Sequence, residues 1–214
     1  MTWKNEWLRL YAVTDRSWLR GHTLMEQVEQ ALSGGATMVQ LREKHMDADS
    51  LVREAVEMTR LCHRYGVPLL INDDVEAVRR SGADGVHVGQ SDMEAAAARG
   101  VLGSGMIVGV TAKTVEQALA AQAAGADYLG SGAVFGSSTK TDARPMTRET
   151  LQAICRAVSI PVVAIGGIGR SNIMELAGTD IAGVAVVSGI FASEDIAAEC
   201  RFLRQAAENI ALHR

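Results

Sequence analysis

The chain has 214 residues and a formal net charge of -4 at pH 7, with 48% hydrophobic and 21% charged residues. This composition excludes an intrinsically disordered chain, and the acidic balance argues against a broad nucleic-acid surface, which needs a concentrated basic patch. No apolar run approaches the roughly 18 residues of a membrane span, and the amino terminus lacks the apolar centre of a signal peptide. We therefore expect a soluble, cytoplasmic protein.

Short apolar runs alternate with amphipathic stretches along the whole chain. Strands are predicted at residues 8–13, 36–41, 67–71, 84–88, 106–110, 126–130, 161–165 and 182–187. The stretches between them show helical spacing of apolar residues. Two examples are the series Leu51, Ala55, Met58, Cys62 and Tyr65, and the series Ile196, Cys200, Leu203, Ala207 and Ile210.

A short motif recurs where a predicted helix gives way to a strand. It reads "GGATMVQL" from Gly34, "SGADGVHV" from Ser81 and "AGADYLGS" from Ala124, with a looser relative, "IAGVAVVSG", from Ile181. Glycine at this place is typical of a helix C-cap, and the recurrence indicates a repeated strand and helix unit.

Eight strands that are apolar on both faces, each separated by a helix, favour a parallel sheet covered by helices. We predict a single (β/α)8 TIM-barrel domain over residues 1–214, since no linker or low-complexity segment divides the chain. A doubly wound open sheet is the alternative, because periodicity does not reveal whether a sheet closes. The three cysteines, Cys62, Cys155 and Cys200, are widely separated without a C-x-x-C pair, so we expect packing residues.

Polar residues gather at the carboxyl ends of the predicted strands, where parallel barrels carry their active sites. In "QLREK", strand alternation points Gln40, Arg42 and Lys44 to one side, with Leu41 and Glu43 opposite. Two cations on one side suit an anionic ligand. The alternative is that Arg42 and Lys44 pair with Glu43 or Asp47 on a solvated loop.

Carboxylates follow the next two predicted strands. In "INDD", Asp74 is interpreted as a helix N-cap, whereas Asp73 beside the cations suits magnesium with a diphosphate. Asp92 would supply a second carboxylate, although an N-cap ahead of "MEAAAARG" is the alternative. His87 lies within a strand, where a lone histidine is more often a satisfied core group, and it receives no role.

Three later loops are candidates for phosphate binding. "AIGGIGRSNI" places two glycines after a strand and before a helix, and "VVSGIF" follows the last strand, so their backbone N–H groups could face an anion. The loop "GSSTKTDARP" is either a flexible connector or a lid that closes Lys140 over a leaving phosphate.

Together, "QLREK", "INDD", "HVGQSD", "GVTAKT", "STKTDAR", "AIGGI" and "VVSGIF" resemble the thiamin phosphate synthase family, over Leu8 to Ile210. The resemblance implies a (β/α)8 barrel that joins hydroxymethylpyrimidine diphosphate to hydroxyethylthiazole phosphate and releases diphosphate. It implies magnesium held by Asp73 and Asp92, and catalytic roles for Arg42, Lys44, Thr111 and Lys140.

The resemblance also implies two substrate subsites. The pyrimidine diphosphate would contact Gln40, Leu41, Arg42, Glu43, Lys44, Asn72, Thr111 and Lys140. The thiazole phosphate would contact Ser137, Ser138, Thr139, Gly167, Val187 and Ser188. The family usually has Ser-Ala-His-Thr where this chain has Thr111 to Thr114, so Lys113 replaces a histidine, and Thr-Glu-Thr-Lys where it has Ser137 to Lys140.

Two other functions are kept open. A thiazole tautomerase on the same barrel would need neither magnesium nor diphosphate, and a noncatalytic barrel would bind phosphorylated ligands without turnover. The oligomeric state is also open, with a homo-oligomer among the alternatives. Trp3, Trp7 and Trp18 would either cap the bottom of the barrel or contact another subunit.

Overall fold

The computed structural model describes residues 3–89, 95–136 and 146–212. Eight short parallel strands close into a barrel in the order β1 to β8. Their bounds are β1 (Leu10–Val13), β2 (Met38–Leu41), β3 (Leu69–Asn72), β4 (Gly85–Val88), β5 (Ile107–Thr111), β6 (Tyr128–Gly132), β7 (Val162–Ile165) and β8 (Gly183–Val186). Strands are thus found at all eight predicted places.

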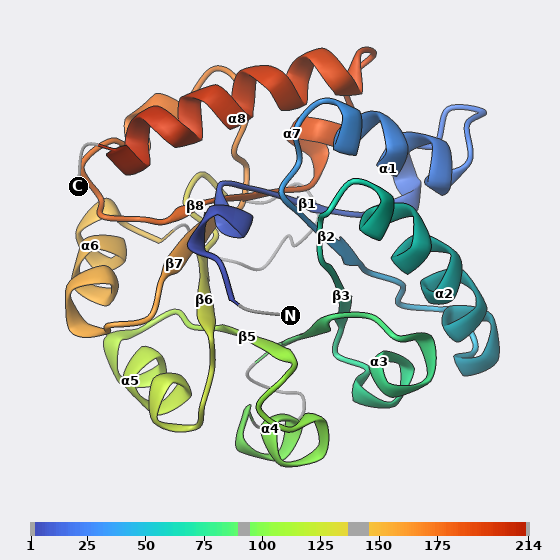
Figure 1. Ribbon diagram of the computed structural model, residues 1–214. Coiled ribbons are helices and arrows are strands. Elements are labelled where there is room, and N and C mark those ends of the chain that lie inside the picture. Colours follow the sequence, from blue (N-terminus) through green and yellow to red (C-terminus); the bar gives the residue numbers. More distant parts are fainter. Residues whose placement is uncertain (1–2, 90–94, 137–145, 213–214) are drawn as a thin grey trace.

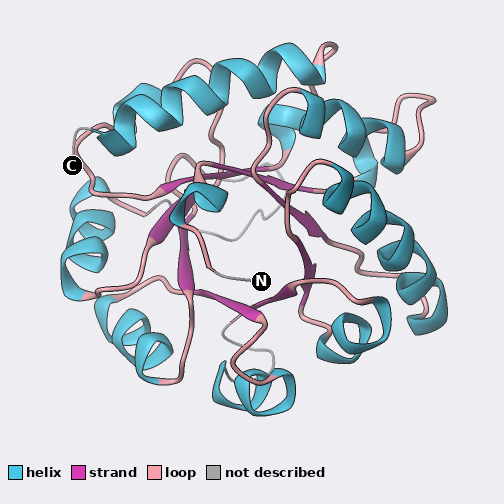
Figure 2. Cartoon of the chain, in the orientation of Figure 1, coloured by secondary structure: helices cyan, strands magenta, loops and turns pink. Residues whose placement is uncertain are grey.

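Helices form a ring around the strands (Figures 1 and 2). The α-helices are α1 (Leu24–Ser33), α2 (Ala48–Arg64), α3 (Val75–Ser81), α4 (Ala95–Leu102), α5 (Val115–Ala123), α6 (Arg148–Ala157), α7 (Ser188–Phe191) and α8 (Ile196–Leu212). Three 3₁₀ turns accompany them in the described ranges: η1 (Asn5–Leu8), η2 (Arg16–Trp18) and η3 (Ile173–Leu176). No helix in these ranges is both long enough and apolar enough to cross a membrane.

The first and last strands settle the choice between a closed barrel and an open sheet. β1 pairs with β2 on one side and with β8 on the other, and Leu10 lies opposite Val184 in the second pairing. Every strand therefore has two parallel neighbours, which an open sheet does not provide. The doubly wound alternative is wrong, because a closed barrel leaves no strand edge unpaired.

The segment between β7 and β8 differs from the expected helix. It contains only the 3₁₀ turn η3. The Asn172 side chain bonds back to the preceding loop, to the Gly167 carbonyl and the Gly169 N–H at 2.9 Å each. The helical geometry ends at Ala177, which has a ψ of 133°, and Gly178 then adopts a φ of 75°.

Strand alternation divides the apolar residues into two clusters. One lies inside the barrel and includes Tyr11, Met38, Leu70, Tyr128 and Val163. The larger one fills the layer between strands and helices, and includes the buried thiols Cys62 and Cys200. The predicted apolar series from Ile196 to Ile210 is buried in α8. In the series from Leu51 to Tyr65, Tyr65 at the end of α2 is 42% exposed. Each strand therefore contributes one face to each cluster.

The recurring motif joins the strands in pairs at the bottom of the barrel. In its first three copies a polar side chain accepts a backbone N–H at the start of the preceding strand: Thr37 from Leu10 at 2.9 Å, Asp84 from Leu69 at 2.8 Å and Asp127 from Val108, the second residue of β5, at 2.7 Å. The backbone N–H of each polar residue returns a bond to the same strand at 2.8 Å. These paired bonds, here called the strand clamps, connect each of these strands to the next one, and they are the structural role of the repeat.

Candidate active site

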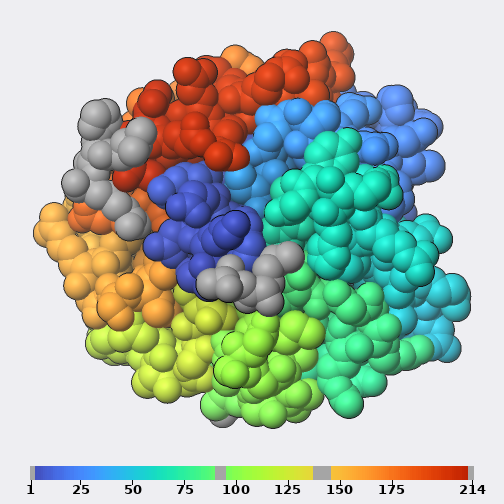
Figure 3. All heavy atoms as spheres, viewed as in Figure 1, coloured from blue at the N-terminus to red at the C-terminus, as the bar shows by residue number. Residues whose placement is uncertain are grey.

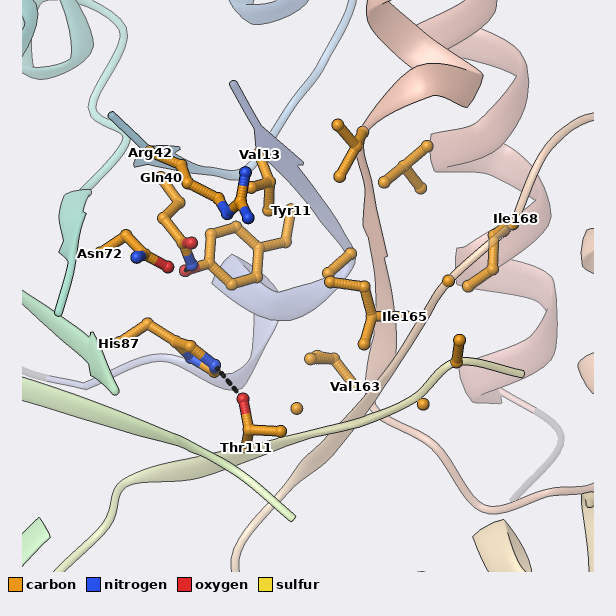
Figure 4. A pocket seen from close by; sticks show the side chains of 18 of the residues that line it. Tyr11, Val13, Gln40, Arg42, Asn72, His87, Thr111, Val163, Ile165 and Ile168 are labelled. Atoms are coloured by element: carbon orange, nitrogen blue, oxygen red, sulfur yellow. Dashed lines mark hydrogen bonds between the residues drawn. The ribbon is translucent and has the colours of Figure 1, made fainter. Parts of the chain in front are cut away.

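A cavity opens inside the barrel above the apolar interior, and all eight strands or the loops after them contribute to its wall (Figure 4). Its polar residues include Gln40, Arg42, Asn72, His87, Thr111, Lys113 and Ser188. Its apolar wall includes Val13, Val163, Ile165, Ile168, Ala185 and Val187. Of the predicted site residues, Gln40, Arg42, Asn72, Thr111 and Ser188 thus converge on one space, whereas Lys44 and Asp73 do not line it.

The end of β2 supplies an amide and a guanidinium to this cavity. Gln40 is 4% exposed, and its amide Nε2 donates to the Tyr11 hydroxyl at 2.5 Å. Arg42 lies beside it, with its backbone N–H donating to Thr14 Oγ1 at 3.0 Å. Among the described residues, no acid lies within ion-pair distance of Arg42. Its charge therefore faces the cavity.

The other residues of "QLREK" point elsewhere. Leu41 is fully buried in the outer cluster, and Glu43 pairs with Arg16 at 2.7 Å. Burial raises the pKa of the Glu43 carboxyl, although Arg16 opposes this change. Lys44 is exposed and borders a second groove, beside Asp15 and Trp18, which shares Arg42 with the main cavity. Alternation fails to place Lys44 because β2 ends at Leu41.

The loop after β3 holds an acid in an unusual backbone conformation. Asp73 has a φ of 63°, in the left-handed region that aspartate tolerates better than most residues. Its carboxylate accepts from the Asn72 amide at 2.5 Å and from the Gly89 N–H at 3.3 Å. Asp74 caps α3 by accepting from the Ala77 N–H at 2.7 Å, as the sequence indicates. Two adjacent acids thus occupy different environments.

His87 lies between the cavity and the barrel interior. Its Nε2 is 3.0 Å from Thr111 Oγ1, and its Nδ1 is 2.8 Å from the Tyr128 hydroxyl. The Tyr128 hydroxyl in turn donates to the Tyr11 hydroxyl at 3.0 Å. Burial raises the pKa of both tyrosines, so their hydroxyls stay protonated at neutral pH. A chain of hydrogen bonds therefore links Gln40 to Thr111 beneath the cavity.

The loops after β6, β7 and β8 meet at the opposite wall. Gly166 and Gly167 have φ values of 105° and 65°, and a Cβ at Gly167 would lie 2.8 Å from the Phe135 carbonyl oxygen. A Cβ at Gly189 would lie 2.3 Å from the Ile168 carbonyl oxygen. The glycines therefore allow these backbones to pack closely, and Gly167, Val187 and Ser188 face the cavity together.

Five predicted site residues lie outside the described part of the chain: Asp92, Ser137, Ser138, Thr139 and Lys140. Within the described ranges, no three His, Cys, Asp or Glu side chains come close enough to form a metal site by themselves. The carboxylate of Asp73 is the described part of the predicted pair.

Sequence reasoning missed Tyr11 and Tyr128 and gave His87 no role. Both tyrosines looked like ordinary strand residues, because their side-chain direction depends on the register of neighbouring strands. One signal was available. Gly109 and Gly130 stand at inward positions of β5 and β6, and a glycine at an inward position leaves room for a large ring from a neighbouring strand.

Comparisons with known proteins agree with this geometry. A family model described as thiamine monophosphate synthase matches residues 10–190. A thiamine-phosphate synthase of Ruminiclostridium cellulolyticum is 48% identical over 187 residues, covering 87% of this chain and 89% of that protein. One of Clostridium tetani is 44% identical over 200 residues, covering 94% and 96%.

The likeness extends to a solved structure. The thiamine phosphate pyrophosphorylase of Pyrococcus furiosus superposes with a TM-score of 0.89 at 35% identity, covering 96% of this chain and 98% of that chain. With the barrel, the converging strand ends and these matches established, the chain belongs to the thiamine monophosphate synthase family.

Proposed function

We propose that this protein joins hydroxymethylpyrimidine diphosphate to hydroxyethylthiazole phosphate, forming thiamin phosphate and releasing diphosphate. The observation that carries the proposal is the convergence of Gln40, Arg42, Asn72 and Thr111 on one side of a cavity, with Gly167 and Ser188 on the other. Relatives of nearly full length carry the name of this activity.

The two walls suit the two substrates. Amide and hydroxyl groups of Gln40, Asn72 and Thr111 can hydrogen-bond the ring nitrogens and amino group of a pyrimidine. Arg42 offers the diphosphate a planar, bidentate cation. On the opposite wall, backbone N–H groups near Gly167, Val187 and Ser188 can receive the thiazole phosphate.

The remaining predicted contacts have secondary roles in this proposal. Leu41 contacts the pyrimidine substrate through its backbone only, because its side chain is buried among the helices. Glu43 keeps Arg16 at the rim of the second groove, and Lys44 approaches the diphosphate from that groove. Ser137, Ser138, Thr139 and Lys140 complete the thiazole side and the lid.

Magnesium fits the oxygen donors at this rim. Mg²⁺ is commonly bound through one or two carboxylates together with substrate phosphates, and Asp73 presents its carboxylate at the strand end beside Asn72. Its neighbour Asp74 is engaged in capping α3, so the two carboxylates have different partners. We propose that Asp73 and Asp92 hold the ion, which when bound neutralises charge on the diphosphate.

The reaction requires the carbon–oxygen bond to the diphosphate to break, with its electron pair leaving on the diphosphate oxygen. The thiazole nitrogen then donates its lone pair to the exposed carbon, and a carbon–nitrogen bond forms. Arg42, Lys44 and Lys140 stabilise the departing charge more than the bound substrate, which lowers the barrier. The apolar wall of Val163, Ile165 and Ala185 excludes water that would capture the same carbon.

The direct test mixes both phosphorylated substrates with the protein and follows thiamin phosphate, with and without a chelator. We expect coupling that stops on chelation. Asp73→Asn should reduce turnover by at least about a hundredfold, the equivalent of about 2.7 kcal/mol of transition-state stabilisation. Asp74→Asn is the matched control, because asparagine also caps helices well and Asp74 caps α3.

Two results would contradict the proposed reaction, and a third would contradict only the metal assignment. Isomerisation of a thiazole phosphate carboxylate without coupling would favour a tautomerase, and binding of both ligands without turnover would favour a noncatalytic barrel. Undiminished coupling in Asp73→Asn would remove the metal assignment while leaving the reaction in place.

A further inference from the structure

The amino-terminal arm, residues 3–9, covers the bottom of the barrel. Figure 3 shows dark blue atoms of this segment near the middle of the visible face, in front of the ring of strands that Figure 1 draws from the same side. The arm includes η1, and Trp7 is only 8% exposed and belongs to the interior cluster. The family model begins at residue 10, so this arm precedes the matched region. The arm thus lies outside the region that the family model matches.

Trp3 reaches from the arm to a tyrosine inside the barrel. The rings of Trp3 and Tyr128 have centroids 6.1 Å apart and planes 10° from parallel. Trp7 packs edge-on against Trp3 with centroids 5.9 Å apart, and the Trp3 indole N–H donates to Asn5 Oδ1 at 2.8 Å. The Trp3 ring is therefore held from two sides while it supports Tyr128 from below.

Tyr128 has little freedom apart from this support. A Cβ at Gly109 would lie 2.2 to 2.3 Å from three atoms of the Tyr128 side chain, so the ring lies against the bare backbone of β5. Tyr11 packs on it edge-on with centroids 5.9 Å apart. Its direction toward the barrel bottom is covered by Trp3. Removing the indole would take away this contact.

A series of hydrogen bonds connects the Tyr128 hydroxyl to Thr111 at the cavity wall. The Tyr128 hydroxyl gives its single proton to Tyr11, so it accepts from His87 Nδ1–H. A neutral His87 protonated at Nδ1 has a lone pair on Nε2, which accepts the Thr111 hydroxyl proton at 3.0 Å. The Thr111 oxygen is thereby oriented as an acceptor toward the cavity that it lines. Figure 4 shows His87 and Thr111 side by side at this wall.

We propose that Trp3 is a positioning residue, which acts through Tyr128 and His87 to orient the Thr111 hydroxyl toward the pyrimidine substrate. This inference rests on the proposed function for the identity of the substrate. The contacts themselves are independent of it. Trp3 and Tyr128 touch no substrate in this scheme, and their effect is to set a tautomer and a hydroxyl direction.

The first experiment reads the tautomer of His87 directly. Imidazole ¹⁵N chemical shifts of the protein are recorded by NMR at neutral pH, and the His87 signals are identified by their loss in His87→Asn. We expect Nδ1 protonation in the wild type and a shift toward Nε2 protonation in Tyr128→Phe, which removes the acceptor. Trp3→Ala should shift the signals in the same direction. Unchanged His87 signals in Trp3→Ala overturn the inference.

The second experiment measures steady-state kinetics. Trp3→Ala should raise KM for the pyrimidine diphosphate about fivefold, the change that corresponds to one hydrogen bond of about 1 kcal/mol, and leave KM for the thiazole phosphate unaltered. In a Tyr128→Phe background, Trp3→Ala should have no further effect on KM, because the connection is already broken. Independent, multiplying effects would contradict the scheme.

Controls separate positioning from general loss of stability. Leu32→Ala removes a buried side chain between α1 and its neighbours and should lower the melting temperature without changing either KM or the His87 signals. Trp3→Leu replaces Trp3→Ala if the latter folds poorly, since it keeps apolar bulk but no ring. A wild type that makes no thiamin phosphate would refute the proposed function, and the NMR result would then decide the inference alone.

Discussion

Gly109 offers a sharp test of how tightly the barrel interior is packed. An alanine at this strand position has no positive φ to adopt, so replacing glycine would ordinarily stabilise the chain by about 0.5–1 kcal/mol. Here the added Cβ would lie 2.2 Å from Tyr128 Cζ and 2.3 Å from its Cε1 and Oη. Gly109→Ala should therefore destabilise the folded protein, where a glycine-to-alanine change in a strand would ordinarily stabilise it.

The magnitude follows from the inability of Tyr128 to retreat. The ring is fully buried, Trp3 lies parallel to it and Tyr11 packs edge-on, so accommodation requires movement of a strand. Overpacking of this kind costs about 1–3 kcal/mol. With three atoms inside normal contact distance we expect the upper end, about 3 kcal/mol, which lowers the melting temperature of a chain of this size by about 6–12 °C.

The assay is thermal unfolding followed by circular dichroism. Gly100→Ala is the matched control, because Gly100 lies in α4 with open space at its Cβ position and should gain stability. In a Tyr128→Val background the ring is gone, and Gly109→Ala should then cost almost nothing. A wild-type melting temperature for Gly109→Ala, or an equal loss in the Tyr128→Val background, would refute the packing argument.

Two further predictions concern ionisable groups. Burial raises the pKa of Cys62 and of Cys200 to about 12, so thiol reagents at about pH 8 should modify neither until the protein unfolds, and rapid labelling of the folded chain would contradict this. The backbone N–H of Thr23 holds the pKa of Glu26 below its ordinary value, so the stabilisation is present above that value and is lost as the pH falls. The deficit in melting temperature of Glu26→Ala should accordingly be larger at pH 7 than at about pH 3, and an equal deficit at both would exclude a charge-dependent cap.

Much of the fold could be predicted because its information is local. Short apolar runs and helical spacing of apolar residues are properties of neighbouring residues, and they located eight strands and the faces of α2 and α8. Closure could not be read in this way, since it depends on β1 meeting β8 across nearly the whole chain. The preference for a barrel came from the count of strand and helix units.

The site residues likewise divide into those that local patterns could predict and those that depend on distant contacts. Gln40, Arg42, Asn72 and Thr111 could be predicted to lie near one another because strand ends of a parallel barrel meet at one rim, and they line one cavity. Lys44 was placed on the wrong basis, because alternation holds only while the chain remains a strand. The link from Trp3 to His87 escaped detection because it joins side chains from separate strands and the arm, and no spacing in the sequence encodes their contact.

The strand clamps at the bottom of the barrel affect which side chains face the cavity at the opposite end. Shifting a strand by one residue would exchange its two faces and turn Gln40 or Asn72 toward the helices. Thr37 and Asp84 each fix the first residue of a strand to its neighbour, and so set the starting point from which the later residues are counted. Side chains at the bottom of the barrel thereby determine which residues of each strand face the cavity at the top.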